Sequence, residues 1–137
     1  MTSIELPSRP RVLLVDDDDG LRRALARALR RDFRVTEASD GRAAIELLAA
    51  ESFSFDAVVT DLEMPGVSGD QVVAWLDRHC PALAERVLIL SGGASTRAKE
   101  EWLCTLNPAR LLKKPCPVGV IIAAIRGVLD PEREASD

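Results

Sequence analysis

The sequence is poor in the residue types on which several kinds of catalytic and metal sites depend. Among 137 residues it has no tyrosine, three cysteines and one histidine, His79. A single histidine excludes most Ser–His and Cys–His catalytic arrangements, which need an imidazole base beside the nucleophile. The cysteines, Cys80, Cys104 and Cys116, are odd in number and far apart, which fits neither a disulfide framework nor a zinc site. We therefore expect free thiols and a histidine at a helix end.

The sequence also lacks an excess of positive charge and a long hydrophobic run. Lysine and arginine total 18 against 22 aspartates and glutamates, which gives a net charge of −4. A general nucleic-acid-binding surface needs excess positive charge. No apolar run approaches the ~20 residues that cross a bilayer, and residues 1–10 hold no apolar segment of a secretory signal. The sequence therefore predicts a cytoplasmic protein without nucleic-acid or membrane partners.

What the sequence does contain is an alternation of strand and helix patterns. A chain of 137 residues, 47% of them hydrophobic, is enough for one domain with a core. Short apolar or alternating runs predict strands, and they lie at 11–15, 33–38, 56–60, 86–90 and 109–112. Amphipathic spacing predicts helices after each run, at 20–31, 41–50, 70–79, 95–105 and 117–129. We expect one domain over residues 10–130, with flexible tails at 1–9 and 131–137.

Strict alternation of this kind predicts a flavodoxin-like α/β fold, (βα)5, with a doubly wound parallel sheet of five strands. The run at 33–38 alternates apolar and polar residues, which is typical of an edge strand, whereas 11–15 and 56–60 are apolar enough to be buried on both faces. The strand order 2-1-3-4-5 fits these patterns. That order places the ends of the first and third strands side by side.

The first helix carries five arginines and follows a run of four aspartates. We interpret the arginines as a solvated face rather than a DNA-recognition surface, because no second basic element supports the latter. They are Arg22, Arg23, Arg27, Arg30 and Arg31. Among the aspartates, Asp19 is a candidate N-cap of this helix, and Asp18 lies either near a metal or in solvent.

Polar residues follow four of the five predicted strands. They are Asp16, Asp17, Asp61, Ser91, Lys113 and Lys114. In an open parallel sheet, ligands bind beyond the carboxyl ends of the strands at a topological switch point. Clustered carboxylates raise one another's pKa unless a cation neutralises them, and oxygen ligands suit Mg²⁺. The pattern therefore predicts a magnesium site with an aspartate nucleophile, beside a lysine and a serine that can bind phosphoryl oxygens.

Four segments in this order resemble the receiver domain of two-component response regulators. They are Val15-Asp16-Asp17, the run from Thr60-Asp61 to Gly69, Leu90-Ser91-Gly92, and Lys114-Pro115. The resemblance covers about residues 10–130 and includes single-domain members and the receivers of hybrid sensor kinases. It implies a phosphoprotein in a phosphorelay, not an enzyme acting on a second substrate. The phosphoryl group would come from a histidine kinase or a histidine phosphotransfer protein, and a downstream protein target would read the result.

The resemblance also assigns roles at the metal. Asp61 is the expected phosphoacceptor. The expected Mg²⁺ ligands are Asp17 and Asp61 directly, Asp16 mainly through water, and the backbone carbonyl of Glu63. The family pattern therefore places the metal beside the carboxylate that is phosphorylated.

Three further roles follow from the same resemblance. Ser91 is the expected switch hydroxyl. Lys114, rather than Lys113, is expected to bind the carboxylate and then the phosphoryl oxygen. Its bond to Pro115 is expected to be cis.

The chain departs from the family pattern at several positions. Leu111 stands where many members have a switch tyrosine or phenylalanine. Signalling is therefore expected to run through Ser91, residues 92–96 and the helix at 95–105. Glu63 and Gly93 lie at positions that tune phosphoryl lifetime in the family, and we expect a modest lifetime. The last helix is apolar on more than one stripe, so either core packing or a homodimer through 95–105, 109–112 and 117–129 is expected.

Several alternatives remain open at this stage. The chain is either a stand-alone receiver, a relay or phosphate sink, or a receiver fragment of a hybrid sensor kinase. A pseudo-receiver that docks partners without phosphorylation is a second class. A phosphatase similar to haloacid dehalogenases is a third, because Glu63 could be misread as the second acid of that family. Turnover of a generic phosphate ester would support the phosphatase.

Overall fold

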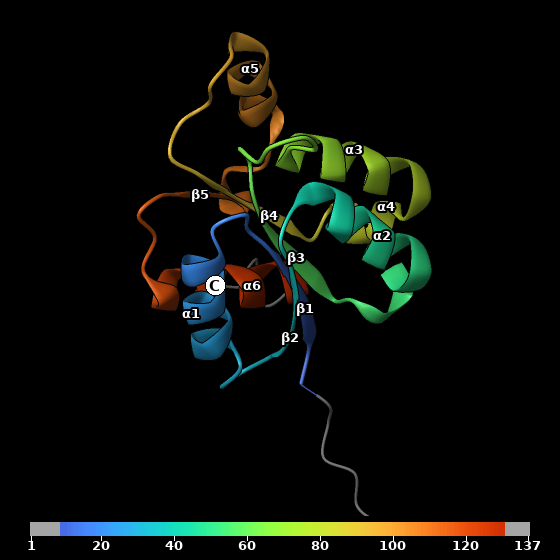
Figure 1. Ribbon diagram of the computed structural model, residues 1–137, viewed down its shortest axis with the longest axis vertical. Helices are drawn as coiled ribbons and strands as arrows, with labels where there is room; N and C mark the ends of the chain where they lie inside the picture. Colours follow the sequence, from blue (N-terminus) through green and yellow to red (C-terminus); the bar gives the residue numbers. More distant parts are fainter. Residues whose placement is uncertain (1–8, 131–137) are drawn as a thin grey trace, which may run out of the picture.

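The computed structural model describes residues 9–130, and its centre is a sheet of five parallel strands. The strands lie in the order β2-β1-β3-β4-β5 (Figure 1), which confirms the predicted order and fold class. The strands are β1 (Arg11–Val15), β2 (Arg34–Ala38), β3 (Ala57–Asp61), β4 (Val87–Ser91) and β5 (Leu111–Lys113). Their carboxyl ends therefore form the edge at which a ligand site was predicted.

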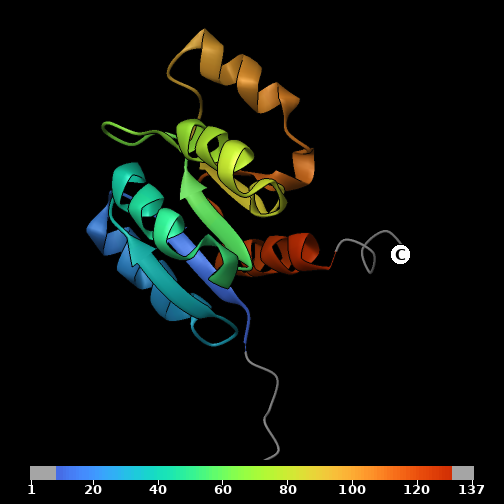
Figure 2. The same ribbon diagram turned by 90° about the vertical axis from the view of Figure 1, so that its right-hand side faces the viewer.

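Helices cover both faces of the sheet (Figures 1 and 2). α1 (Asp19–Leu29) and α6 (Val118–Leu129) lie on one face, and α2 (Gly41–Glu51) and α3 (Gly69–His79) lie on the other. α5 (Arg97–Thr105) stands at one end of the molecule in both views. The sequence patterns do not predict three short elements, which are α4 (Pro81–Ala84) and the 3₁₀ turns η1 (Ser52–Ser54) and η2 (Pro108–Arg110).

The central strands are buried on both faces because successive side chains of a strand point to opposite sides of the sheet. In β3, Val58 packs into the core under α2 and α3, and Val59 packs into the core under α1 and α6. Only Ala38 is buried in β2, which lies at the edge of the sheet. This difference in burial explains why apolar and polar residues alternate along β2, whereas they do not alternate along β3.

The beginning of α1 differs from the prediction. Its N-cap is Asp18, whose carboxylate accepts a hydrogen bond from Leu21 N at 3.1 Å, so the assignment of Asp19 as the cap is wrong. The solvated-face interpretation is also wrong for Arg22, which is only 7% exposed. Its guanidinium is buried because it donates to Asp19 at 2.7 Å and to Glu37 of β2 at 3.1 Å.

The last helix packs through one stripe and leaves another in solvent. Ile121 and Ile125 are its buried residues, whereas Val118 and Val120 are 36% and 48% exposed. α6 therefore contributes to the core and also presents apolar side chains outside it. These observations are consistent with core packing and with a homodimer surface, the two interpretations of this helix from the sequence. None of the helices in residues 9–130 combines the length and the hydrophobicity needed to cross a membrane.

The predicted tails fall almost wholly outside the described residues. Only Arg9 of the segment 1–9 is described, and it donates to Arg30 O at 2.7 Å and accepts from Arg34 Nε at 2.9 Å. Residues 131–137 lie outside the described part of the chain. The histidine prediction is confirmed, because His79 is the last residue of α3. All three cysteines are free.

Candidate functional site

Three carboxylates meet at the carboxyl ends of β1 and β3. One oxygen from each of Asp16, Asp17 and Asp61 lies within 4.8 Å of the others. They meet because β1 and β3 are neighbours, with Val15 opposite Thr60 in the register of the strands. Asp16 and Asp61 are 5% and 3% exposed, and Asp17 is open to solvent. The cluster can therefore hold a cation from the solvent side.

Lys114 supplies a positive charge to this cluster from the end of β5. Its Nζ lies 2.6 Å from Asp61 Oδ1, and that buried oxygen accepts no hydrogen bond of regular geometry from the described residues. The peptide bond from Lys114 to Pro115 is cis, as expected. The lysine before the proline therefore makes the ion pair, which is where the sequence placed it.

Ser91 reaches the same edge from the end of β4. It is 6% exposed, and its carbonyl accepts a hydrogen bond from Lys114 N at 2.9 Å. Its hydroxyl oxygen accepts a hydrogen bond from Gly93 N at 3.1 Å. Ser91 is thus hydrogen-bonded both to the backbone of Lys114 and to the loop that leads to α5.

The electrostatics of Asp61 are unfavourable without a cation. Burial, and then the neighbouring Asp16 carboxylate, raise the pKa of Asp61 to about 7, although the Lys114 ammonium acts in the opposite direction. One ammonium does not balance three carboxylates at this separation. A hard divalent cation with oxygen ligands would balance them, and Asp16, Asp17 and Asp61 are ligands of that kind. The residues present therefore fit Mg²⁺.

Arg22 contacts the backbone of the carboxylate cluster, and the sequence did not predict this role. Its Nη1 donates to the carbonyl oxygen of Asp16 at 2.9 Å, while the same side chain pairs with Asp19 and Glu37. It therefore holds the backbone that carries two of the carboxylates. The partner Glu37 comes from β2, so no local pattern in the sequence could have signalled this contact.

The loop after Asp61 packs tightly against the start of α3. Gly69 N donates to Leu62 O at 2.8 Å. A Cβ at Gly69 would lie 2.3 Å from the carbonyl oxygen of Asp61. Ser68 begins the helix in a capping box with Gln71. The sequence predicts a loop here, but the close contact that requires glycine is visible only in the structure.

Glu63 lies two residues after Asp61, and its side chain crosses to the segment before α5. Its carboxylate accepts hydrogen bonds from Ser95 N at 3.0 Å and from Lys99 Nζ at 2.8 Å. The Lys99 ammonium and then the Ser95 N–H lower the pKa of Glu63. Lys99 is a second residue that sequence reasoning missed, because nothing local connects it to Glu63.

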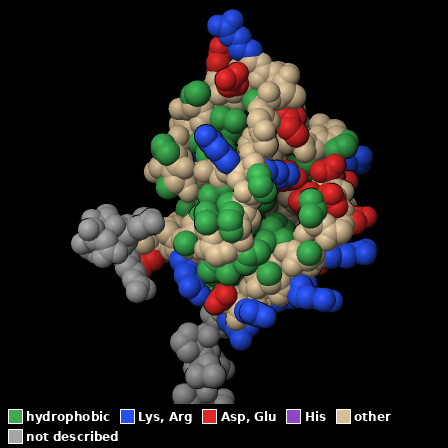
Figure 3. All heavy atoms as spheres, turned by 90° about the vertical axis from the view of Figure 1, so that its left-hand side faces the viewer, with side chains coloured by type: hydrophobic (Ala, Val, Ile, Leu, Met, Phe, Trp, Pro, Cys, Tyr) green, Lys and Arg blue, Asp and Glu red, His purple; other side chains and the backbone are tan. Residues whose placement is uncertain are grey.

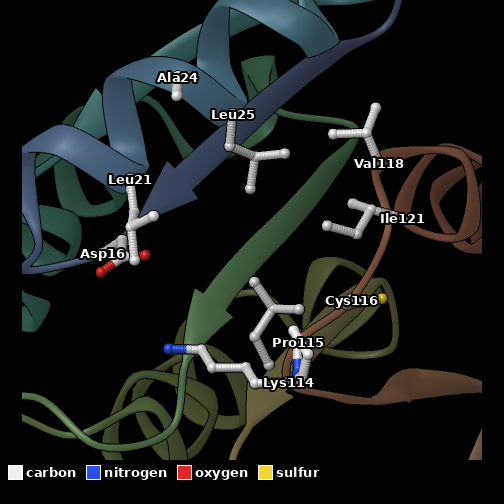
Figure 4. Close-up of a pocket in the computed structure, with 10 residues that line it drawn as sticks. Asp16, Leu21, Ala24, Leu25, Lys114, Pro115, Cys116, Val118 and Ile121 are labelled. Carbon is white, nitrogen blue, oxygen red and sulfur yellow. The ribbon is translucent and has the colours of Figure 1, made fainter.

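A groove of about 570 Å³ opens beside the cluster, between α1 and the segment that follows β5. Asp16 and Lys114 line it where it meets the cluster (Figure 4). Its walls are apolar and consist of Leu21, Ala24, Leu25, Leu90, Pro115, Cys116, Val118 and Ile121. Figure 3 shows hydrophobic side chains gathered at the centre of this face of the molecule. The groove joins an apolar surface to the charged residues.

Comparisons with known proteins agree on one family. The family model for the response regulator receiver domain matches residues 12–126. The transcriptional regulatory protein FixJ of Azorhizobium caulinodans is 30% identical over 130 residues, which are 94% of this chain and 59% of FixJ. The transcriptional activator protein PfeR of Pseudomonas aeruginosa is 46% identical over 77 residues, which are 56% of this chain and 24% of PfeR. The chain thus spans less than two thirds of the length of these relatives.

A solved structure shows the same similarity in three dimensions. The response regulator receiver protein from Sinorhizobium medicae matches with a TM-score of 0.75 and 29% identity. The match covers 89% of this chain and 95% of that one.

Proposed function

This chain belongs to the response regulator receiver domain family, and from that membership and the site geometry we propose that Asp61 is its phosphoacceptor. Receiver domains are signalling domains that interact with histidine kinases, and they are not classical enzymes. The observation that carries the proposal is the convergence of Asp16, Asp17 and Asp61 on one point, with Lys114 in contact with Asp61. A phosphoryl-accepting carboxylate needs this set of neighbours.

The transfer is a displacement at phosphorus. A carboxylate oxygen of Asp61 attacks the phosphoryl group of a phosphohistidine. The P–N bond breaks, and its electron pair stays on the imidazole nitrogen, so Asp61 becomes an acyl phosphate. Lys114 moves from the carboxylate to a phosphoryl oxygen, and the Ser91 hydroxyl donates to another. These contacts offset negative charge that a buried carboxylate alone cannot balance.

Magnesium is the cofactor that suits this site. Asp16, Asp17, Asp61 and the backbone carbonyl of Glu63 are the proposed ligands. When bound, the ion neutralises negative charge on the transferring phosphoryl group. Arg22 fixes the backbone of Asp16, and so keeps that part of the ligand set in place.

The donor is proposed to approach over the groove beside α1. The groove leads to Asp16 and Lys114, so a histidine presented there reaches the cluster. Its apolar walls can exclude water from the transferring group, which favours transfer over hydrolysis. A histidine kinase or a histidine phosphotransfer protein is the proposed source, and the cytoplasm is the proposed compartment.

The output is proposed to be a conformational change read by a downstream protein. Leu111 cannot act as an aromatic switch, so the change would pass through Ser91 and residues 92–96 to α5. Val118 lines the groove beside α1, whereas the exposed Val120 of α6 supports a pairing surface formed by α5, β5 and α6. The relatives include a sensor histidine kinase, so the receiver of a longer hybrid kinase fits the same observations.

The phosphoacceptor is tested by intact-protein mass after incubation with Mg²⁺ and acetyl phosphate. We expect the wild-type protein to gain the mass of one phosphoryl group, and Asp61→Asn to gain none. Removal of Mg²⁺ should abolish labelling, since the carboxylates then repel the anionic donor. Asp77→Asn, a change at an exposed aspartate of α3, should label as the wild type does.

Two other outcomes would contradict the proposal. A folded wild-type protein that gains no phosphoryl group under these conditions favours the docking pseudo-receiver. Steady turnover of a generic phosphate ester favours the phosphatase.

A further inference from the structure

The ion pair between Glu63 and Lys99 connects the phosphoacceptor loop to α5 across 36 residues of sequence. Both oxygens of the carboxylate are used, one by Lys99 Nζ at 2.8 Å and one by Ser95 N at 3.0 Å. The Lys99 side chain is 22% exposed and the Glu63 side chain is 39% exposed, whereas those of Arg97 and Glu101 on the same helix are 91% and 70% exposed. The Glu63–Lys99 pair is therefore less open to solvent than the Arg97–Glu101 pair.

α5 has few other attachments to the molecule. None of its residues is buried, whereas α3, of similar length, buries Gly69, Val72, Val73 and Leu76. Trp102 and Leu103 are only partly buried against the core. Figure 2 shows the helix standing away from the rest of the fold. The polar contact with Glu63 is therefore one of a small number of contacts that hold α5 in place.

The segment that leads into α5 is tied at both ends to the candidate site. At its start, Ser91 Oγ accepts from Gly93 N at 3.1 Å. Near its end, Ser95 N donates to Glu63. Gly93, which lies between these two contacts, has a φ of +132°, a conformation that suits glycine. Only three residues separate Ser91 from Ser95, so a displacement of Ser91 is passed on to the donor of Glu63.

We propose that Lys99 is a positioning residue and that its pair with Glu63 is a latch between Asp61 and α5. The latch is closed when Asp61 carries no phosphoryl group. When Ser91 moves to bind the phosphoryl group, residues 92–95 follow, the carboxylate loses its partners, and α5 is released. This inference rests on the proposed role of Asp61, and it names the contact that regulates that site.

The latch has a measurable consequence at the reaction itself. If only the form with the open latch accepts a phosphoryl group readily, opening the latch by mutation raises the fraction of the protein that is competent for phosphorylation, and with it the labelling rate. We expect Lys99→Ala to be labelled by acetyl phosphate and Mg²⁺ severalfold faster than the wild type. Lys99→Arg, which keeps the charge, should restore most of the wild-type rate. A purely structural role for Lys99 would leave the labelling rate unchanged.

Trp102 lies on α5 and reports its release directly. In a Trp75→Phe background it is the remaining tryptophan, and its fluorescence should change when acetyl phosphate is added. In Lys99→Ala most of that change should be present before phosphorylation, and amide exchange in α5 should be faster. The matched control is Arg97→Ala, which removes a cation from the same helix without touching Glu63. The control should behave as the unmodified background does.

The outcomes separate this inference from the proposed function. Normal labelling of the wild type, with Lys99→Ala indistinguishable from Arg97→Ala in rate, fluorescence and exchange, overturns the latch alone. Failure of the wild type to accept a phosphoryl group overturns the role of Asp61. It then also overturns the proposed coupling between Asp61 and α5. Faster labelling of Lys99→Ala with α5 already released supports the latch.

Discussion

Gly69→Ala is expected to lower the free energy of unfolding by about 3 kcal/mol or more, the upper part of the range for overpacking. The added Cβ would lie 2.3 Å from Asp61 O and 3.1 Å from both Asp61 C and Leu62 Cα. All three are backbone atoms, so no side chain can rotate away to relieve the contact. The first turn of α3 and the backbone of Asp61 and Leu62 must therefore separate. Urea unfolding followed by circular dichroism measures the effect.

The same substitution elsewhere provides the control. Gly119→Ala, near the start of α6, places the new Cβ more than 4 Å from every described atom outside the local backbone of the helix. It should change the stability by no more than about 1 kcal/mol, in the direction of greater stability. In Gly69→Ala the labelling of Asp61 should also fall, because the loop moves relative to Asp16 and Lys114. A Gly69→Ala protein as stable as Gly119→Ala would show that the packing is looser than described.

Asp61→Asn is expected to stabilise the metal-free protein at neutral pH, and this gain should depend on pH. The pKa of Asp61 is about 7 in the folded protein, because of burial first and the Asp16 carboxylate second, against a reference value of 3.8. Between these values the unfolded chain has released the proton while the folded protein retains it. The stability of the wild type therefore falls as pH rises through this window, and it levels off above pH 7.

The size of the effect follows from the shift, which would be worth about 4 kcal/mol if fully realised. From pH 5 to pH 8 the advantage of Asp61→Asn should grow by about 2 to 3 kcal/mol. Urea unfolding in the presence of a chelator checks this, with Asp77→Asn as the control that removes an exposed carboxylate. A constant difference between Asp61→Asn and the wild type would show that the carboxylate is not destabilised by its surroundings. Added Mg²⁺ should stabilise the wild type more than the variant.

Sequence alone determined the strands, their order and the residues at their ends. Apolar runs predict buried strands because the central strands of a parallel sheet are covered on both faces, and the alternating run at 33–38 predicts an edge for the same reason. Once that order is set, Asp16, Asp17 and Asp61 have to meet, and the structure brings them within 4.8 Å. Lys114 could be preferred over Lys113 because the family pattern places the lysine directly before Pro115.

Only the tertiary structure decided how these residues are supported. The partner that buries Arg22 is Glu37, fifteen residues away on the neighbouring strand, and the partner of Lys99 lies 36 residues away. The tight contact of Gly69 with the backbone of Asp61 depends on how α3 docks. Local patterns report the period and burial of one element. Contacts of this kind depend on how separate elements pack, and no pattern within a single element encodes that packing.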